Sequence, residues 1–233
     1  YEAYYNYIKA MAEKLVEEFG TDELLTWRFG CMTEYENADW FRSKDSDPQK
    51  SAESYCKLYD YTAAALCDVL GDGVYIGAHS MTVTEGLWDE EIFIKHVATE
   101  KNYKTGKVGT PINFLSASFY DTKPGKFTKG KTLSETVDYL RNTAEKYGLN
   151  DLTYGIDEGR ILYGNAKGKE DDALFNRTCG DTWQAAYDAR LYKTCIDKDI
   201  EYFSSWGYLT GGALSGYPII SYFVAQNTAL FDG

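Results

Sequence analysis

The stretch TLSETVDYLRNTAEKYGLNDLTYGIDEG, residues 132–159, decides the fold class. Its first residues, Thr132 and Glu135, have the spacing of a capping box, which predicts the start of a helix. Apolar residues then recur at helical spacing until Gly148, a typical helix end. A short apolar strand is predicted next, over 152–157, and acidic residues stand at its end. The stretch therefore predicts a helix followed by a buried strand with carboxylates at its C-terminal end.

The same alternation of helices and strands extends along the rest of the chain. Further helices are predicted near residues 2–19, 51–70, 89–101, 180–195 and 219–231. Buried strands are predicted over residues 25–32, 74–78, 112–119, 152–157 and 200–206. Strands that alternate with helices of this length form a parallel sheet with right-handed crossovers.

Polar residues gather directly after the predicted strands. They are Glu34, His79, Ser118, Glu158 and Trp206. In a (β/α)8 TIM barrel the active site is built at this end of the strands. A doubly wound open sheet is the competing architecture, but the glycine-rich phosphate loop typical of it is missing from the sequence. We therefore expect an α/β fold of the (β/α)8 barrel type.

Composition excludes several classes of partner. The 233 residues are 44% hydrophobic, which is enough for one folded domain. The sequence has no run of about 18 apolar residues, so we expect no membrane insertion. The net charge of −12 disfavours nucleic acid. The five cysteines form no CxxC pair, so we expect no zinc, and free thiols and disulfides both remain open.

Two acidic residues, Glu34 in WRFGCMTEYEN and Glu158 in LTYGIDEGRIL, end strands in well-separated parts of the chain. A retaining glycosidase needs such a pair: one carboxylic acid protonates the leaving oxygen, and a carboxylate about 5 Å away attacks the sugar carbon. Glu36 is the rival acid, although its loop position favours a solvated charge or a substrate contact. Asp157 should point away from Glu158 by strand alternation, which favours a structural role.

Several segments together resemble glycoside hydrolase family 39, the retaining barrel family that includes β-xylosidases and α-L-iduronidase. TWRFGCMTEYENADWF, residues 26–41, is similar to the family's fourth strand, which ends in Asn-Glu-Pro-Asn. LTYGIDEGRIL, residues 152–162, is similar to the seventh strand, which ends in Ile-Thr-Glu. The other similar segments, in family order, are SYCKLYDYTAAAL (54–66), VYIGAHS (74–80), NFLSASFYD (113–121), TWQAAYDARL (182–191) and EYFSSWGY (201–208).

The resemblance implies a retaining glycosidase that cleaves a carbohydrate substrate, with Glu34 as acid/base and Glu158 as nucleophile, and with no metal or cofactor. Two departures leave the sugar open: Thr33 stands where the family has an Asn that binds the 2-hydroxyl, and Ser118 stands where a His is common. Two alternatives remain open. One is a non-catalytic carbohydrate-binding or structural barrel, and the other is a lyase or transglycosidase using the same residues.

Further residues are expected around this pair. The expected substrate contacts are Thr33, Asn37, His79, Ser118, Tyr120 and Trp206. Within that set, Tyr120 is expected to donate a hydrogen bond to Glu158, and Trp206 could form the floor under a sugar ring, with core packing as its alternative. Trp40 and Arg160 are expected at the rim of the cleft. His96 lies on a predicted helix and is expected at the surface.

By the resemblance, the opening helix corresponds to the third helix of the barrel. Residues 1–233 would then form a partial catalytic domain, with strands four to eight present and strands one to three missing. Such a remnant exposes strand edges and core side chains. We therefore expect a second polypeptide, a cleaved upstream fragment or further sequence to supply the missing strands, and a domain-swapped homodimer is the alternative. The substrate class implies a secreted protein.

Overall fold

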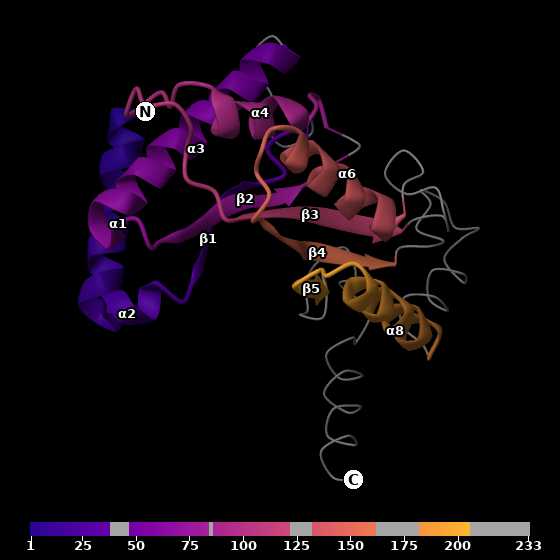
Figure 1. Cartoon of the computed structure of the whole chain (residues 1–233). Coiled ribbons are helices and arrows are strands. Elements are labelled where there is room, and N and C mark those ends of the chain that lie inside the picture. Colours follow the sequence, from indigo (N-terminus) through magenta and orange to yellow (C-terminus); the bar gives the residue numbers. More distant parts are fainter. Residues whose placement is uncertain (38–46, 84–85, 122–131, 162–181, 206–233) are drawn as a thin grey trace, which may run out of the picture.

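One parallel sheet organises the part of the chain that the computed structural model describes, residues 1–37, 47–83, 86–121, 132–161 and 182–205. Its five strands lie in the order β1-β2-β3-β4-β5, so each strand pairs with its neighbours in sequence (Figure 1). The strands are β1 (Arg28–Thr33), β2 (Tyr75–Met81), β3 (Phe114–Asp121), β4 (Thr153–Ile161) and β5 (Tyr202–Ser205). The predicted parallel α/β sheet is confirmed, and its closure into a barrel stays a prediction.

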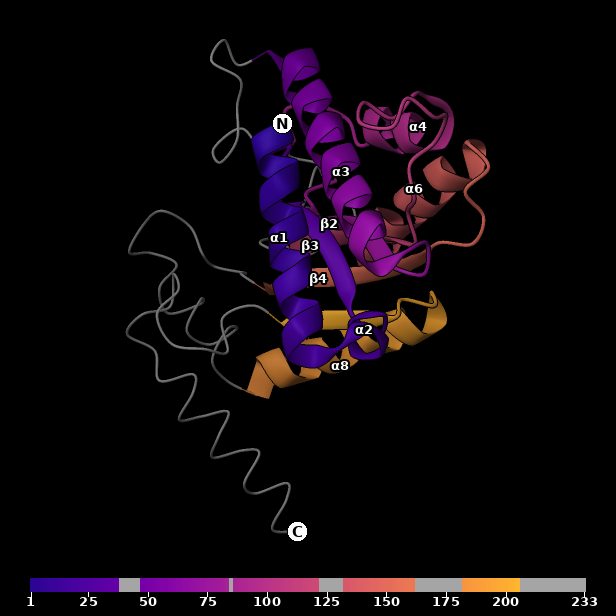
Figure 2. The same ribbon diagram turned by 90° about the vertical axis from the view of Figure 1, so that its left-hand side faces the viewer.

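Helices α1 and α2 precede β1, and the other helices of the described chain connect successive strands (Figure 2). They are α1 (Glu2–Phe19), α2 (Thr21–Leu24), α3 (Pro48–Leu70), α4 (Glu91–Thr99), α6 (Leu133–Lys146) and α8 (Thr182–Asp197). Helix α3 contacts α1 and β1, α6 contacts β3, and α8 contacts both β4 and β5. Parallel strands need such crossover helices, because each new strand starts at the same end of the sheet.

Local sequence signals explain where the helices begin and end. At the start of α6, the Glu135 N–H donates to Thr132 Oγ1 at 3.2 Å, and the Thr132 N–H donates to Glu135 Oε2 at 2.7 Å. The predicted capping box is therefore formed. Helix α3 begins after Asp47, whose side chain accepts from the Lys50 N–H, and the short helix α2 was not predicted. The helix predicted near 219–231 lies outside the described residues.

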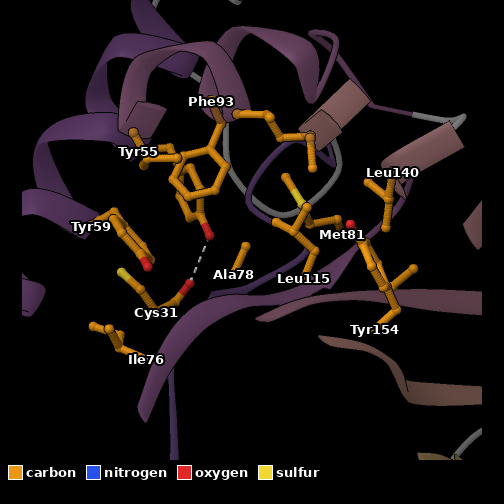
Figure 3. Packing of buried hydrophobic residues seen from close by; sticks show 14 of the residues in the cluster. Cys31, Tyr55, Tyr59, Ile76, Ala78, Met81, Phe93, Leu115, Leu140 and Tyr154 are labelled. Atoms are coloured by element: carbon orange, nitrogen blue, oxygen red, sulfur yellow. Dashed lines mark hydrogen bonds between the residues drawn. The ribbon is translucent and has the colours of Figure 1, made fainter. Parts of the chain in front are cut away.

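An aromatic core lies between the strands and the helices α3 and α4 (Figure 3). Tyr59 and Phe93 are fully buried and meet edge to face, with ring centroids 4.8 Å apart. The buried Tyr55 hydroxyl donates to the Cys31 carbonyl at 3.2 Å, which ties α3 to β1. The free thiols in the described part of the chain belong to Cys31, Cys56, Cys67 and Cys195. Cys179 lies outside it.

His96 corrects one expectation, because this residue is 2% exposed and lies inside the molecule. Its Nε2 lies 3.0 Å from Asp60 Oδ2, an atom that also accepts from the Tyr103 N–H at 2.6 Å. Thr110 Oγ1 donates to the other Asp60 oxygen at 2.6 Å. A buried carboxylate must have its acceptors satisfied, and this network also fastens the loop after α4 to α3.

Candidate active site

The C-terminal end of the sheet carries the irregular backbone of the described chain. A register shift lies near this end in all four strand pairings: between Cys31 and Thr33, Ala78 and Met81, Ala117 and Ser118, and Ile156 and Gly159. Positive φ angles occur close by at Met32 (56°), Glu34 (45°), Ser80 (47°) and Val83 (58°). Left-handed backbone is costly for residues other than glycine and clusters at functional sites. This end of the sheet is therefore the candidate site.

Glu34 follows β1 directly and is 8% exposed. Its N–H donates to the Ser80 carbonyl at 3.0 Å, which fixes the residue against the end of β2. The Asn37 side-chain amide donates to Glu34 Oε2 at 3.0 Å. Asn37 thus contacts the candidate acid/base, and its expected contact with substrate stays a prediction.

Glu158 lies on β4, opposite Ser118 of β3 in the strand register. The Tyr120 hydroxyl donates to Glu158 Oε1, so this expected hydrogen bond is confirmed. Burial raises the pKa of the Glu158 carboxyl, the hydrogen bond from Tyr120 opposes that change, and the charge of Glu34 raises the pKa further. The effect of Glu34 on Glu158 means that the two carboxylates interact electrostatically across the end of the sheet.

Glu36 is buried, so the expectation of a solvated charge is wrong, and a substrate contact stays a prediction. It is 2% exposed, and its Oε1 accepts hydrogen bonds from the Thr82 N–H and from Thr82 Oγ1, the latter at 3.1 Å. Burial raises its pKa to about 7, and the neighbouring Glu34 adds to the increase. Glu36 therefore joins the segment after β1 to the segment after β2.

Asp157 lies at an irregularity in the pairing of β4 with β3. Ala117 pairs with Ile156 and Ser118 pairs with Glu158, so Asp157 is an extra residue in β4 with no partner of its own on β3. A bulge of this kind breaks the strict alternation of side chains. The Asp157 carboxylate contacts His79, with 2.8 Å between Asp157 Oδ2 and His79 Nδ1. This contact places the Asp157 carboxylate against β2, and its expected orientation away from Glu158 stays a prediction.

The remaining predicted site residues are Thr33 and Ser118, which the structure describes, and three whose side chains it does not describe. Thr33 is half-buried and pairs in register with His79. Ser118 is 4% exposed, and its hydroxyl has no hydrogen-bond partner within the residues that the structure describes. Trp40, Trp206 and the side chain of Arg160 lie outside the described part of the chain.

Two classes of site are not found among the described residues. They contain no cluster of three or more His, Cys, Asp or Glu side chains arranged to hold a metal ion. None of the helices within the described ranges combines the length and the apolar character needed to cross a membrane.

No protein-family model matches the chain. Several solved structures do match it. A bacterial orthologue of human α-L-iduronidase matches with a TM-score of 0.66 and 18% identity, over 89% of this chain and 34% of that one. A monomeric β-xylosidase from Caulobacter crescentus matches with a TM-score of 0.60 and 19% identity, over 88% of this chain and 38% of the xylosidase. A glycoside hydrolase family 39 enzyme from Xanthomonas axonopodis pv. citri matches with a TM-score of 0.58 and 17% identity, over 88% of this chain and 37% of that enzyme.

These similarities show that the chain shares its fold with parts of glycoside hydrolases. The chain spans only somewhat more than a third of the length of each of these proteins. Because fold alone does not determine function, the chemistry must be argued from the residues of the site.

Proposed function

We propose that the chain carries the two catalytic carboxylates of a retaining glycoside hydrolase. Glu158 would attack the anomeric carbon and form a covalent glycosyl-enzyme, while Glu34 protonates the departing oxygen. Glu34 would then take a proton from water, which hydrolyses the intermediate and frees Glu158. The observation that carries this proposal is the placement of two carboxyl groups, Glu34 directly after β1 and Glu158 on β4, at the C-terminal end of one parallel sheet.

The hydrogen-bond partners support this division of roles. A phenol that donates to a carboxylate favours the ionised form, so the Tyr120 bond suits a nucleophile at Glu158. Glu34 is the more buried of the two and is held by Asn37. The resemblance assigns the same roles to the same two positions.

The substrate is proposed to be a glycoside whose hydroxyl groups meet Thr33, His79, Ser118 and Trp206. The Ser118 hydroxyl is buried beside Glu158 in the register and has no hydrogen-bond partner among the described residues, so it can bind a sugar hydroxyl. The names of the matched enzymes, a β-xylosidase and an α-L-iduronidase orthologue, make aryl xylosides and aryl iduronides the first substrates to test.

The proposal includes a partner that completes the barrel. Within the described residues β1 pairs only with β2, and β5 pairs only with β4. Open edges of this kind present unpaired backbone groups that another strand can bind. We assign the remaining strands to a polypeptide segment outside residues 1–233, and the activity belongs to the assembled protein.

The test of the catalytic roles is a pair of substitutions in the assembled protein. Glu158→Gln removes the nucleophile, so we expect aryl glycoside hydrolysis to be abolished. Glu34→Gln should slow substrates with poor leaving groups by about 10²–10⁴-fold and those with good leaving groups much less, because only the former need protonation. The measurement is kcat/KM across a series of aryl leaving groups.

Glu145→Gln is the matched control, since Glu145 is exposed on α6 and should leave all rates unchanged. Unchanged rates in Glu158→Gln, or equal slowing of all leaving groups in Glu34→Gln, would reject the assigned roles. Retained sugar binding without turnover in the unsubstituted protein would favour the carbohydrate-binding alternative.

A further inference from the structure

Asp157 is the most connected carboxylate at the C-terminal end of the described sheet. Its Oδ2 accepts from the Ser80 N–H at 3.0 Å and from the Ser116 hydroxyl, and it lies 2.8 Å from His79 Nδ1. Its Oδ1 accepts from the Tyr202 hydroxyl at 2.6 Å. One side chain thus connects β4 with β2, β3 and β5, immediately before the candidate nucleophile.

Two glycines make room for the side chains that bind Asp157. A Cβ added to Gly30 of β1 would lie 2.5 Å from His79 Cβ, and a Cβ added to Gly155 of β4 would lie 2.3 Å from the Tyr202 ring. Both distances are far below van der Waals contact. The neighbouring strands are therefore shaped so that the imidazole and the phenol both reach the Asp157 carboxylate.

The charges around His79 favour its protonated form. The hydrogen bond to Asp157 is the largest influence that raises the pKa of His79, partial burial lowers the pKa, and the charge of Glu158 raises it. From the other strands, Ser116 and Tyr202 approach Asp157 as neutral donors. Burial opposes ionisation of Asp157, but the hydrogen bonds from His79, Ser116 and Tyr202 outweigh it and lower the pKa of this carboxyl.

We propose that Asp157 is a positioning residue that holds His79 as an imidazolium beside Glu158. The inference rests on the proposed function, because its consequence concerns Glu158 as nucleophile. With Nδ1 bound to Asp157, the ring has a fixed orientation and its Nε2–H remains available as a donor. The positive charge of His79 lowers the pKa of Glu158 and so favours the ionised carboxylate that a nucleophile requires.

The test follows the protonation of His79 directly by NMR in the full chain. The sequence contains two histidines, so each imidazole can be assigned by replacing His79 with Gln. In the unsubstituted protein we expect the His79 titration midpoint to lie above 6.5, its ordinary value. In Asp157→Asn, which keeps the shape and removes the charge, the midpoint should move down by about one pH unit or more.

Two controls accompany this measurement. His96, which contacts Asp60 and Glu100, should titrate identically in both proteins. Asp121→Asn makes the same change at the end of β3, where the carboxylate binds Tyr187 and not His79, so it should leave the His79 midpoint unchanged. A purely structural role for Asp157 predicts no specific movement of the His79 midpoint.

A His79 midpoint at or below 6.5 in the unsubstituted protein would overturn the inference, and this result does not depend on whether Asp157→Asn folds. An unchanged midpoint in Asp157→Asn would overturn it as well. Since the NMR titration does not depend on turnover, a shifted midpoint in a protein that hydrolyses no glycoside would support this ionic pair while rejecting the proposed function.

Discussion

Four acidic side chains meet at the C-terminal end of the sheet, and their surroundings give them different properties. Glu34 is bound by an amide, Glu158 by a phenol, Asp157 by an imidazole, and Glu36 by a backbone N–H and a hydroxyl. Hydrogen bonds to the charged form favour ionisation, whereas burial opposes it. The same functional group can therefore act as proton donor, nucleophile, positioning group or structural link within one small region.

Glu36 gives a prediction about stability rather than catalysis. Its pKa is raised from 4.5 to about 7 in the folded chain, so its contribution to stability is complete below about pH 4.5 and is lost as the pH rises through 7. The loss amounts to something on the order of 3 kcal/mol. Glu36→Gln can still accept from Thr82 but cannot ionise, so its free energy of unfolding should decline less between pH 5 and pH 8.

Urea denaturation across this pH range measures the difference. Glu145→Gln, an exposed substitution of the same kind, should follow the pH dependence of the unsubstituted chain. If the profile of Glu36→Gln ran parallel to that of the unsubstituted chain, Glu36 would be ionised in the folded protein at pH 5 and the assigned cause would be wrong.

The order and spacing of the sequence motifs predicted which residues occupy the strand ends, but they could not predict where each carboxylate points. Glu34 follows β1, and His79, Ser118 and Glu158 lie in the C-terminal halves of β2, β3 and β4, where the alternation of strands and helices was sufficient to locate them. Strand alternation was not sufficient to place Asp157, because the extra residue in β4 breaks the alternation and nothing in the local sequence marks that bulge. Glu36 was misplaced because its partner Thr82 lies 46 positions away along the chain.

Elements with strong local signals were predictable, and those defined by tertiary contacts were not. The capping box at Thr132 and the glycine after α1 fixed helix ends within a few residues. The four-residue α2 has too few residues for a periodic pattern and was missed. Met11 and Phe19 follow the buried Ile8 at helical spacing, a pattern that predicts burial, yet they are 37% and 48% exposed.

The exposed apolar residues of α1 and the open edge of β1 give a prediction about assembly. Tyr7 is 66% exposed and lies one helical turn before Met11. Without the proposed partner, we expect residues 1–233 to self-associate with increasing concentration. Tyr7→Lys together with Met11→Lys should reduce this association, as measured by sedimentation velocity.

Val108→Lys is the control for added charge, because Val108 is 68% exposed in the loop after α4 and should not affect association. A chain that stays monomeric at all concentrations, with stable folding, would contradict the need for a partner. An equal reduction of self-association by Val108→Lys and by the double substitution would contradict it as well.

At the scale of the whole molecule, the chain holds the end of the sheet where the candidate site lies but spans little more than a third of the length of the enzymes it matches. The sheet order β1 to β5 without any reversal is what a consecutive section of a (β/α)8 barrel would show. A closed barrel would enclose the four acidic residues and exclude water from their surroundings. This would strengthen the interaction between Glu34 and Glu158.

The central claim is that Glu158 forms a covalent bond to the sugar. The most direct measurement is peptide mass spectrometry of the assembled protein after incubation with the 2-deoxy-2-fluoro derivative of an aryl glycoside that it hydrolyses. The account predicts hydrolysis of at least one aryl glycoside and a single glycosyl adduct on Glu158. An adduct on another residue, hydrolysis without any adduct, or no hydrolysis across a panel of aryl glycosides would contradict it.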